Sequence, residues 1–159
     1  MSLSVVLAVQ APGRRRAPRS GTAPSAGLRA AGKNVWMPES LRPLMVKITC
    51  GAEAPERANQ AWTVAATALA AGAEVGVWLT GEAVWFAVAS AQPDLGLEHA
   101  TPVAELVAPL SELGAVVVCT QCAARRGLTE ADLLDGCVVA GAATFVERIL
   151  LPGVQALVY

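Results

Sequence analysis

From residue 45 onward, short apolar segments alternate with longer segments that carry the sequence signals of helices. The apolar segments predict strands over residues 46–50, 74–79, 115–119, 137–140 and 154–159. The segments between them predict helices over 55–71, 81–91, 102–113 and 142–150, with short helical turns over 121–126 and 129–132. Strands that alternate with helices across short loops are typical of a parallel sheet with helices on both faces. The alternation therefore predicts an α/β fold.

Local signals agree with these boundaries. Pro55 stands in the first turn of its predicted helix and Gly72 just past the end, which are the positions these residues favour at helix termini. The run Val116-Val117-Val118 is continuous in β-branched residues, as expected for a strand covered on both faces. Because crossovers between parallel strands are right-handed, such a chain favours a sheet wound in both directions. We predict a flavodoxin-like, doubly wound, five-stranded parallel sheet with the strand order 2-1-3-4-5.

The first 44 residues differ from the rest in composition and charge. They are rich in Pro, Gly, Ser, Ala and Arg, and they show no sustained hydrophobic period. Six Arg and one Lys against one Glu give this segment a net charge of +6. We expect residues 1–44 to be a disordered basic extension and residues 45–159 to be the folded domain. A basic arm or an Arg-rich targeting peptide is the alternative, and we favour a dispensable extension.

Composition and charge exclude several classes of function for residues 45–159. This region holds five basic and twelve acidic side chains, a net charge of −7, so general attraction to a nucleic-acid backbone is not expected. No segment reaches the roughly 18 uninterrupted apolar residues of a membrane span. Arginines follow the short apolar stretch at residues 3–9 instead of preceding it, which is the wrong order for a secretion signal. We therefore expect a cytoplasmic protein without nucleic-acid or membrane partners.

The chain has four cysteines, and in a reducing cytoplasm cysteines more often serve metal or redox chemistry than structural disulfides. In an open parallel sheet, ligands gather beyond the carboxyl ends of the strands, at the point where the strand order reverses. In the predicted order this point lies between the first and third strands. These two strands deliver Cys50 and Cys119 to the same crevice, whereas Cys137 falls at the opposite end of its strand.

Cys119 is the strongest candidate for chemistry. It is the last residue of a predicted strand, and the backbone N–H groups of the following helical turn favour a thiolate there. Cys122 completes a C-x-x-C motif, and either Cys122 or Cys50 could resolve a product formed on Cys119. The residues expected to line a substrate pocket around these cysteines are Gly51, Thr80, Gly81, Thr120, Gln121 and Arg125. The alternative is that Cys119 is a buried strand residue that acts as a small hydrophobe.

Other site chemistries have weaker support in the sequence. A zinc site would need Cys50, Cys119 and Cys122 together with His99, the one histidine of the chain, so we predict no metal. Neither G-x-G-x-x-G nor G-x-x-x-x-G-K-[ST] follows a predicted strand, which leaves dinucleotide and nucleoside triphosphate sites unsupported. We therefore predict no cofactor.

Two segments resemble a known family. Residues 116–128, with the sequence VVVCTQCAARRGL, resemble the cysteine segment of DsrE-like proteins, the sulfur-relay group that includes the DsrE, DsrF and TusD subunits. Residues 77–82 resemble the second strand of that family and its Gly-containing loop. The resemblance covers residues 45–159. It implies a flavodoxin-like sheet, assembly into trimers or hexamers, and a persulfide carried on Cys119, with Cys122 as an addition relative to the relay subunits.

The leading hypothesis is therefore a sulfur carrier or transferase, in which Cys119 takes sulfane sulfur from a donor protein and passes it to an acceptor protein. The alternatives are a non-catalytic oligomeric module that binds a small ligand, and a thiol-disulfide redox protein that uses Cys119 and Cys122. The predicted helix 81–91 is apolar on nearly all sides, and one sheet face cannot cover the adjacent rings of Trp85 and Phe86. We therefore expect a homotrimer or homohexamer with one of these rings in the contact.

Overall fold

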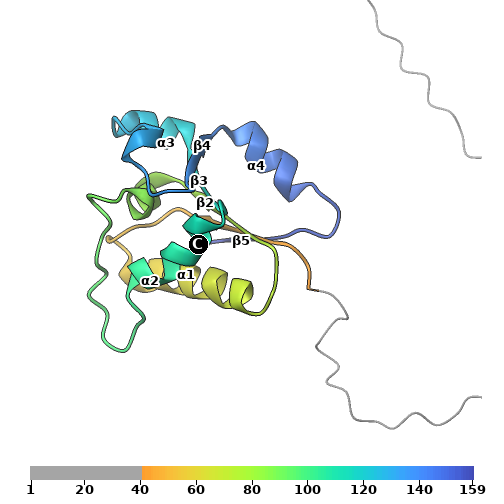
Figure 1. The fold of residues 1–159 in the computed structure, drawn as a ribbon, viewed down its shortest axis with the longest axis horizontal. Helices are drawn as coiled ribbons and strands as arrows, with labels where there is room; N and C mark the ends of the chain where they lie inside the picture. The colour runs from red at the N-terminus through yellow and green to blue at the C-terminus, as the bar shows by residue number, and fades with distance from the viewer. Residues whose placement is uncertain (1–40) are drawn as a thin grey trace, which may run out of the picture. The chain divides into compact units, whose positions relative to one another are not determined.

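The computed structural model describes residues 41–159, which form a five-stranded sheet with helices on both faces (Figure 1). The strands are β1 (Leu44–Ile48), β2 (Val75–Leu79), β3 (Val116–Cys119), β4 (Val138–Ala140) and β5 (Gln155–Val158). All neighbouring pairs are parallel, and the order across the sheet is 4-3-2-1-5. Of the predicted disordered basic extension, residues 1–44, residues 1–40 lie outside the described residues. Residues 41–43 lead into β1, and Leu44 is its first residue.

Four α-helices connect these strands: α1 (Pro55–Ala70), α2 (Val103–Glu112), α3 (Thr120–Arg125) and α4 (Ala142–Ile149). Two 3₁₀ helices, η1 (Gly81–Ala87) and η2 (Glu130–Asp132), complete the connections. Pro55 starts α1 and Gly72 follows its end with a φ of 90°, so both predicted signals for this helix are confirmed. Within residues 41–159, no helix has the length and apolar content needed to cross a membrane.

The three middle strands turn alternate residues towards two different layers, as strands do. Towards α1 and α2 they turn Val46, Ile48, Val77, Leu79, Val116 and Val118. Towards α4 they turn Met45, Trp78 and Val117. Figure 1 shows α1 and α2 on one side of the sheet and α4 on the other. The hydrophobic core therefore has a large layer under two helices and a smaller layer under one.

The strand order explains why the helices divide in this way. The chain steps in one direction from β1 through β2 and β3 to β4, and then returns across the sheet to place β5 beside β1. Right-handed crossovers put the helices of the forward steps on one face and the helix of the return step, α4, on the opposite face. The α/β class and the flavodoxin-like, five-stranded parallel sheet are confirmed.

The order itself differs from the predicted 2-1-3-4-5, because β2 lies between β1 and β3. The reversal of direction consequently lies between β1 and β5. The hydrophobic pattern of a strand indicates that both of its faces are covered. It does not indicate on which side of β1 that strand pairs. The general tendency of consecutive parallel strands to be neighbours favours the observed order.

The segment 81–91, predicted as an apolar helix, is instead the 3₁₀ helix η1, which ends at Ala87. Val88 then forms an isolated antiparallel bridge with Leu133, in the segment that leads to β4. This bridge holds the chain extended where the prediction continued the helix. The apolar residues of the segment are covered from several sides by α2, α3 and β3 of the same chain.

Phe86 is fully buried and packs edge-on against Trp62 of α1, with ring centroids 5.7 Å apart. Of the two rings predicted for a subunit contact, Phe86 is therefore excluded, because the chain covers it. Trp85 remains partly exposed. Its ring is thus the one of the pair that stays available to a partner.

Candidate functional site

The carboxyl ends of β1, β2 and β3 lie at one edge of the sheet, as predicted. Ile48 pairs with Leu79, and Leu79 pairs with Val118. The residues that follow these three, and so leave the sheet at one level, are Thr49, Thr80 and Cys119. The prediction that the first and third strands are neighbours with a crevice between them is wrong, because β2 lies between β1 and β3. Cys137 precedes β4 at the opposite end of the sheet, as the sequence indicated.

Cys119 is the last residue of β3 and the N-cap of α3, with a φ of −63° and a ψ of 124°. Its side chain packs partly against both hydrophobic layers at the sheet edge. Of the four cysteines, Cys119 is the one that is not buried, and all four are free thiols. Thr120 and Gln121, which follow it in the first turn of α3, are exposed. The strand end therefore leaves Cys119 partly exposed beside a helix start.

Cys122 lies on α3 and is buried. Its Sγ atom accepts a hydrogen bond from the backbone N–H of Gly81, with 3.3 Å between nitrogen and sulfur. Gly81 has a φ of 58°, and a Cβ atom there would lie 2.6 Å from the carbonyl oxygen of Thr49. Position 81 therefore requires glycine for both its backbone conformation and its close approach to the β1 loop. The loops after β1, β2 and β3 are packed tightly against one another.

Cys50 belongs to the same buried layer as Cys122. Burial raises the pKa of the Cys50 thiol, although the positive charge of Arg57 acts in the opposite direction. The N–H of Gly51 donates hydrogen bonds to both carboxylate oxygens of Glu53, at 3.0 and 2.9 Å. These contacts fix the loop after β1. Cys50 is thus a protonated, buried thiol at neutral pH.

A charged network joins α3 to the loop after β2. Arg126 places Nη2 2.6 Å from Oε1 of Glu82, and its Nη1 donates to the carbonyl oxygen of Cys122 at 3.1 Å. The indole N–H of Trp85 donates to the other Glu82 oxygen at 3.1 Å. The hydrogen bond from Arg126 is the main reason that the pKa of Glu82 is lowered. Arg125, the predicted pocket residue, is exposed and makes none of these contacts.

Helical spacing is the signal that could have identified Arg126 in place of Arg125. Arg126 lies four residues after Cys122, and residues four apart share a helix face. A cation on the face of Cys122 points towards the loop that contacts this cysteine. Its neighbour Arg125 is turned about 100° away around the helix.

A cavity of about 490 Å³ lies beside these loops. The residues that line it are Ala52, Glu53, Glu82, Trp85, Ala91 and Pro93. Gly51 and Gly81 are the chain neighbours of two of these residues, so they shape the loops without lining the cavity themselves. Thr80, Thr120 and Gln121 likewise lie on the same edge of the sheet outside this cavity.

On the α4 side of the sheet, an aromatic pair lies under a cation. Trp78 of β2 and Phe145 of α4 have ring centroids 5.2 Å apart, and the Nζ atom of Lys47 lies 5.2 Å from the Phe145 centroid. Lys47 and Trp78 are paired in register, so the alternation of the two strands places both on the face that Cys119 partly contacts. Sequence reasoning did not connect α4 with this face, because no local pattern shows which helix covers it.

Residues 41–159 contain no group of three or more His, Cys, Asp or Glu side chains arranged to hold a metal ion. Cys50 and Cys122 share a buried layer, but His99 lies exposed in the loop before α2, with a φ of 61°. The zinc alternative therefore gains no support from this geometry.

Comparison with known proteins agrees with the cysteine segment. A model of the DsrE/DsrF-like family matches residues 44–151. The protein MJ0989 of Methanocaldococcus jannaschii, described as uncharacterized, is 40% identical over 92 residues, which are 55% of this chain and 77% of that protein. The resemblance seen in the sequence is confirmed by the family match.

Two solved structures match this chain. The ychN protein from E. coli has a TM-score of 0.62 at 13% sequence identity, over 75% of this chain and 100% of that one. The MTH1491 protein from Methanobacterium thermoautotrophicum has a TM-score of 0.48 at 16% identity, over 76% and 100%, which is too low to support an argument about fold. The family match spans more than half of the chain and includes β1 to β4 and all four cysteines. This chain belongs to the DsrE/DsrF-like family.

Proposed function

We propose that this protein carries sulfur on Cys119 as a persulfide. The observation that supports this proposal most directly is exposure, because Cys119 is the one cysteine of four that is not buried. Its position as the last residue of β3 and the N-cap of α3 puts this cysteine at the carboxyl edge of the sheet, where the chain leaves the core. Membership in the DsrE/DsrF-like family supports sulfur-relay chemistry at the level of the family.

The proposed reaction is an exchange that leaves the total oxidation state unchanged. The Cys119 thiolate attacks the outer sulfur of a donor protein's persulfide, a new S–S bond forms on Cys119, and the donor's own S–S bond breaks to release its thiolate. An acceptor thiolate then attacks the outer sulfur of the Cys119 persulfide. This second step regenerates the Cys119 thiolate, so no metal, flavin or other cofactor is required.

Burial argues against the other cysteines as carriers. Desolvation raises the pKa of Cys137 to about 11, so only about one molecule in 10⁴ has a thiolate there at pH 7. Burial also raises the pKa of Cys50, and the buried sulfur of Cys122 already accepts a hydrogen bond. Cys122 and Cys50 therefore have less support as resolving cysteines, and we assign to Cys122 a structural role between two loops.

We further propose a cytoplasmic homo-oligomer, a trimer or hexamer, that meets its sulfur donor and acceptor proteins at the carboxyl edge of the sheet. The loops that surround Cys119 there carry the residues of the proposed binding surface: Gly51, Thr80, Gly81, Thr120, Gln121 and Arg125. Arg126 joins this group, since its contacts with Glu82 and Cys122 hold two of the loops together.

The test is the mass of the intact protein after incubation with a low-molecular-weight persulfide, followed by peptide mapping. We expect an adduct of one sulfur atom, about 32 Da, on Cys119. Cys119→Ser should lose this adduct, and Cys137→Ala, at the opposite end of the sheet, should keep it. An adduct that maps to another cysteine, or one that persists in Cys119→Ser, would overturn the proposal.

A further inference from the structure

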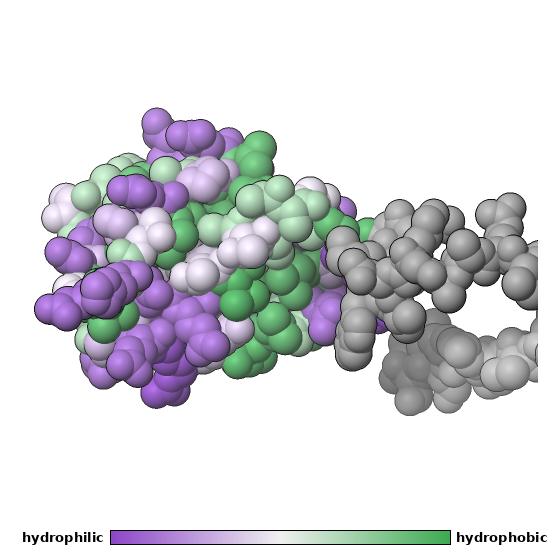
Figure 2. Space-filling model, turned by 90° about the horizontal axis from the view of Figure 1, so that it is seen from below, coloured by the Kyte–Doolittle hydropathy of each residue, from purple (hydrophilic) through white to green (hydrophobic). Residues whose placement is uncertain are grey.

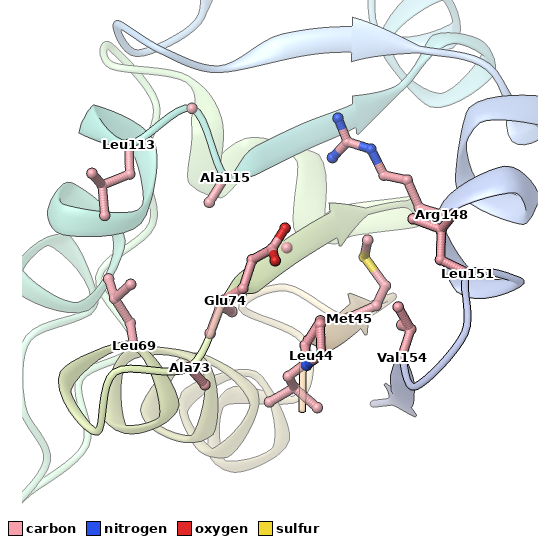
Figure 3. A pocket seen from close by; sticks show the side chains of 14 residues that line it. Leu44, Met45, Leu69, Ala73, Glu74, Leu113, Ala115, Arg148, Leu151 and Val154 are labelled. Carbon is pink, nitrogen blue, oxygen red and sulfur yellow. The ribbon is translucent and has the colours of Figure 1, made fainter. Parts of the chain in front are cut away.

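A hollow of about 500 Å³ lies at the end of the sheet opposite Cys119, where β1, β2 and β3 begin (Figure 3). The helices of a parallel α/β fold run against the strands, so the ends of α1, α2 and α4 also reach the walls of this hollow. Ligand pockets have volumes of about 300–1,000 Å³, so the hollow is large enough for a small molecule. The proposed sulfur chemistry makes no use of it.

Most of the lining is apolar. The large hydrophobic side chains in it are Leu44, Met45, Leu69, Leu113, Leu151 and Val154. Leu113 is 68% exposed and Leu151 is 57% exposed, so much of this apolar surface is accessible to water. Figure 2 shows hydrophobic residues gathered on the half of the surface where the strands begin, with hydrophilic residues gathered towards the opposite end. A ligand with an apolar part would remove such a surface from water.

Two side chains of opposite charge belong to the same lining. Glu74 stands just before β2 and Arg148 in the last turn of α4, and Figure 3 shows both directed into the hollow from different walls. The ion pair found within residues 41–159 joins Glu82 to Arg126, so neither Glu74 nor Arg148 is ion-paired within this part of the chain. A carboxylate and a guanidinium are therefore available to a ligand at a surface that is otherwise apolar.

The helix ends divide the hollow into a side that favours cations and a side that favours anions. The carboxyl end of a helix carries partial negative charge, which a basic residue in the last turn offsets. The last turn of α4 contains Arg148, whereas the last turns of α1 and α2 contain no basic residue. Glu74 follows the end of α1. The wall near α1 and Glu74 therefore attracts a cation, and the wall that carries Arg148 attracts an anion.

We propose that the hollow binds a small zwitterion with an apolar side chain. The ammonium group of this ligand donates to the Glu74 carboxylate, the ligand carboxylate accepts from the Arg148 guanidinium, and the apolar side chain lies against the leucines of the lining. An apolar anion would be repelled by Glu74 and an apolar amine by Arg148, whereas a zwitterion satisfies both. A free apolar amino acid and a short apolar peptide share this chemistry, and they differ in the separation of their two charges.

Isothermal titration calorimetry on the full-length chain tests the proposal with L-leucine and with the dipeptide leucyl-leucine. We expect at least one of them to bind at millimolar concentration, and the tighter one identifies the source of the ligand. Amidation removes the carboxylate charge of either probe, and N-acetylation removes its ammonium charge. Each modification should weaken binding by about tenfold, because each removes one charged contact.

Two variants show which group of the ligand each side chain holds. In Glu74→Gln the N-acetylated probe should bind as tightly as the parent probe, because no carboxylate then selects the ammonium. In Arg148→Gln the amidated probe should bind as tightly as the parent. Glu105→Gln is the matched control, since Glu105 is exposed on α2 outside the hollow, and it should keep the wild-type preferences. Circular dichroism of each variant establishes that it is folded.

Binding should be the same in Cys119→Ser as in the wild type, because Cys119 lies at the opposite end of the sheet. The site is thus tested separately from the sulfur chemistry. Four results would each overturn the proposal: no binding of either probe at millimolar concentration, equal binding of parent and modified probes by the wild type, unchanged preferences in both hollow variants, or a loss of binding in Cys119→Ser.

Discussion

The sulfur of Cys122 accepts a hydrogen bond from the backbone N–H of Gly81 at 3.3 Å, and this contact joins α3 to the loop after β2. The second cysteine of the C-x-x-C motif is thus in contact with another loop of the candidate site, and its burial withdraws it from solvent. The spacing of the motif suggests a redox pair, but these contacts support a structural role. Cys119 is left as the accessible thiol of the motif.

Cys122→Ala should lower the free energy of unfolding by about 1–3 kcal/mol. The substitution removes a buried sulfur and leaves the Gly81 N–H without its acceptor. Urea unfolding measures this loss, and the persulfide adduct on Cys119 should still form in the folded variant. If the adduct disappears while stability is unchanged, Cys122 takes part in the chemistry.

Gly81→Ala should destabilise the fold more than Gly127→Ala, although both glycines have a positive φ, of 58° and 66°. A Cβ atom at position 81 would lie 2.6 Å from the carbonyl oxygen of Thr49, whereas a Cβ atom at position 127 meets nothing within 4 Å. We expect about 1–2 kcal/mol for Gly127→Ala from the backbone alone, and about 3 kcal/mol or more for Gly81→Ala. Equal losses in thermal or urea unfolding would mean that the β1 loop moves aside freely.

The Glu82–Arg126 ion pair should give a pH-dependent contribution to stability. A carboxyl whose pKa is lowered on folding stabilises the protein above its unfolded pKa, about 4.3, and loses this contribution as the pH falls through the lower folded value. Because the Glu82 side chain is 51% exposed, the contribution at pH 7 should be below about 1 kcal/mol. The difference in unfolding free energy between wild type and Glu82→Gln should therefore be present at pH 7 and shrink towards zero below about pH 4. A difference that does not vary with pH would rule out the ion pair as its cause.

Alkylation near pH 7 should modify Cys119 before Cys137. Burial raises the pKa of Cys137 to about 11 and also blocks the reagent, whereas Cys119 is partly exposed. Mass spectrometry of peptides after brief iodoacetamide treatment measures the order. In denaturant the two rates should converge, and faster labelling of Cys137 in the native protein contradicts the assignment of Cys119.

Deleting residues 1–40 should leave the melting temperature and the far-ultraviolet circular dichroism unchanged, because these residues show no apolar period that would pack on the domain. The deletion should stop before residue 44, since Leu44 begins β1 and pairs with both Val75 and Gln155. Deletion through residue 44 is the comparison, and it should lower the melting temperature. A drop for the shorter deletion would show that the extension packs.

The elements of this fold could be predicted from sequence because their signals are local. Pro55 and Gly72 mark a helix wherever it packs, and Thr129 with Asp132 forms a capping box at the start of the helical turn predicted over 129–132. Strand order is different, because it depends on which strands pair across long loops. The prediction of a crevice between neighbouring strands β1 and β3 was wrong for that reason, although the carboxyl ends of β1, β2 and β3 do lie at one edge.

For the candidate site, too, the features with a local sequence signal could be predicted and those that depend on distant contacts could not. Cys119 could be identified because a strand end and a helix start are both local features. The contacts of Cys122 with Gly81 and of Arg126 with Glu82 join residues about 40 positions apart, so no local pattern contains them. Phe86 was one of two rings expected at an interface, and its burial could not be read locally because its covering residues, among them Trp62, come from another part of the chain.

The return of the chain from β4 to β5 sets the order in which the sheet can be completed during synthesis. β1 pairs with β5 through residues that are more than 100 positions apart, and the Thr49 hydroxyl donates to the carbonyl oxygen of Tyr159 at 2.6 Å. Contacts of such large sequence separation form late and slowly. Until β5 has left the ribosome, one edge of β1 has no partner, and an open strand edge can pair with another chain. β5 therefore protects β1 from association with other nascent chains.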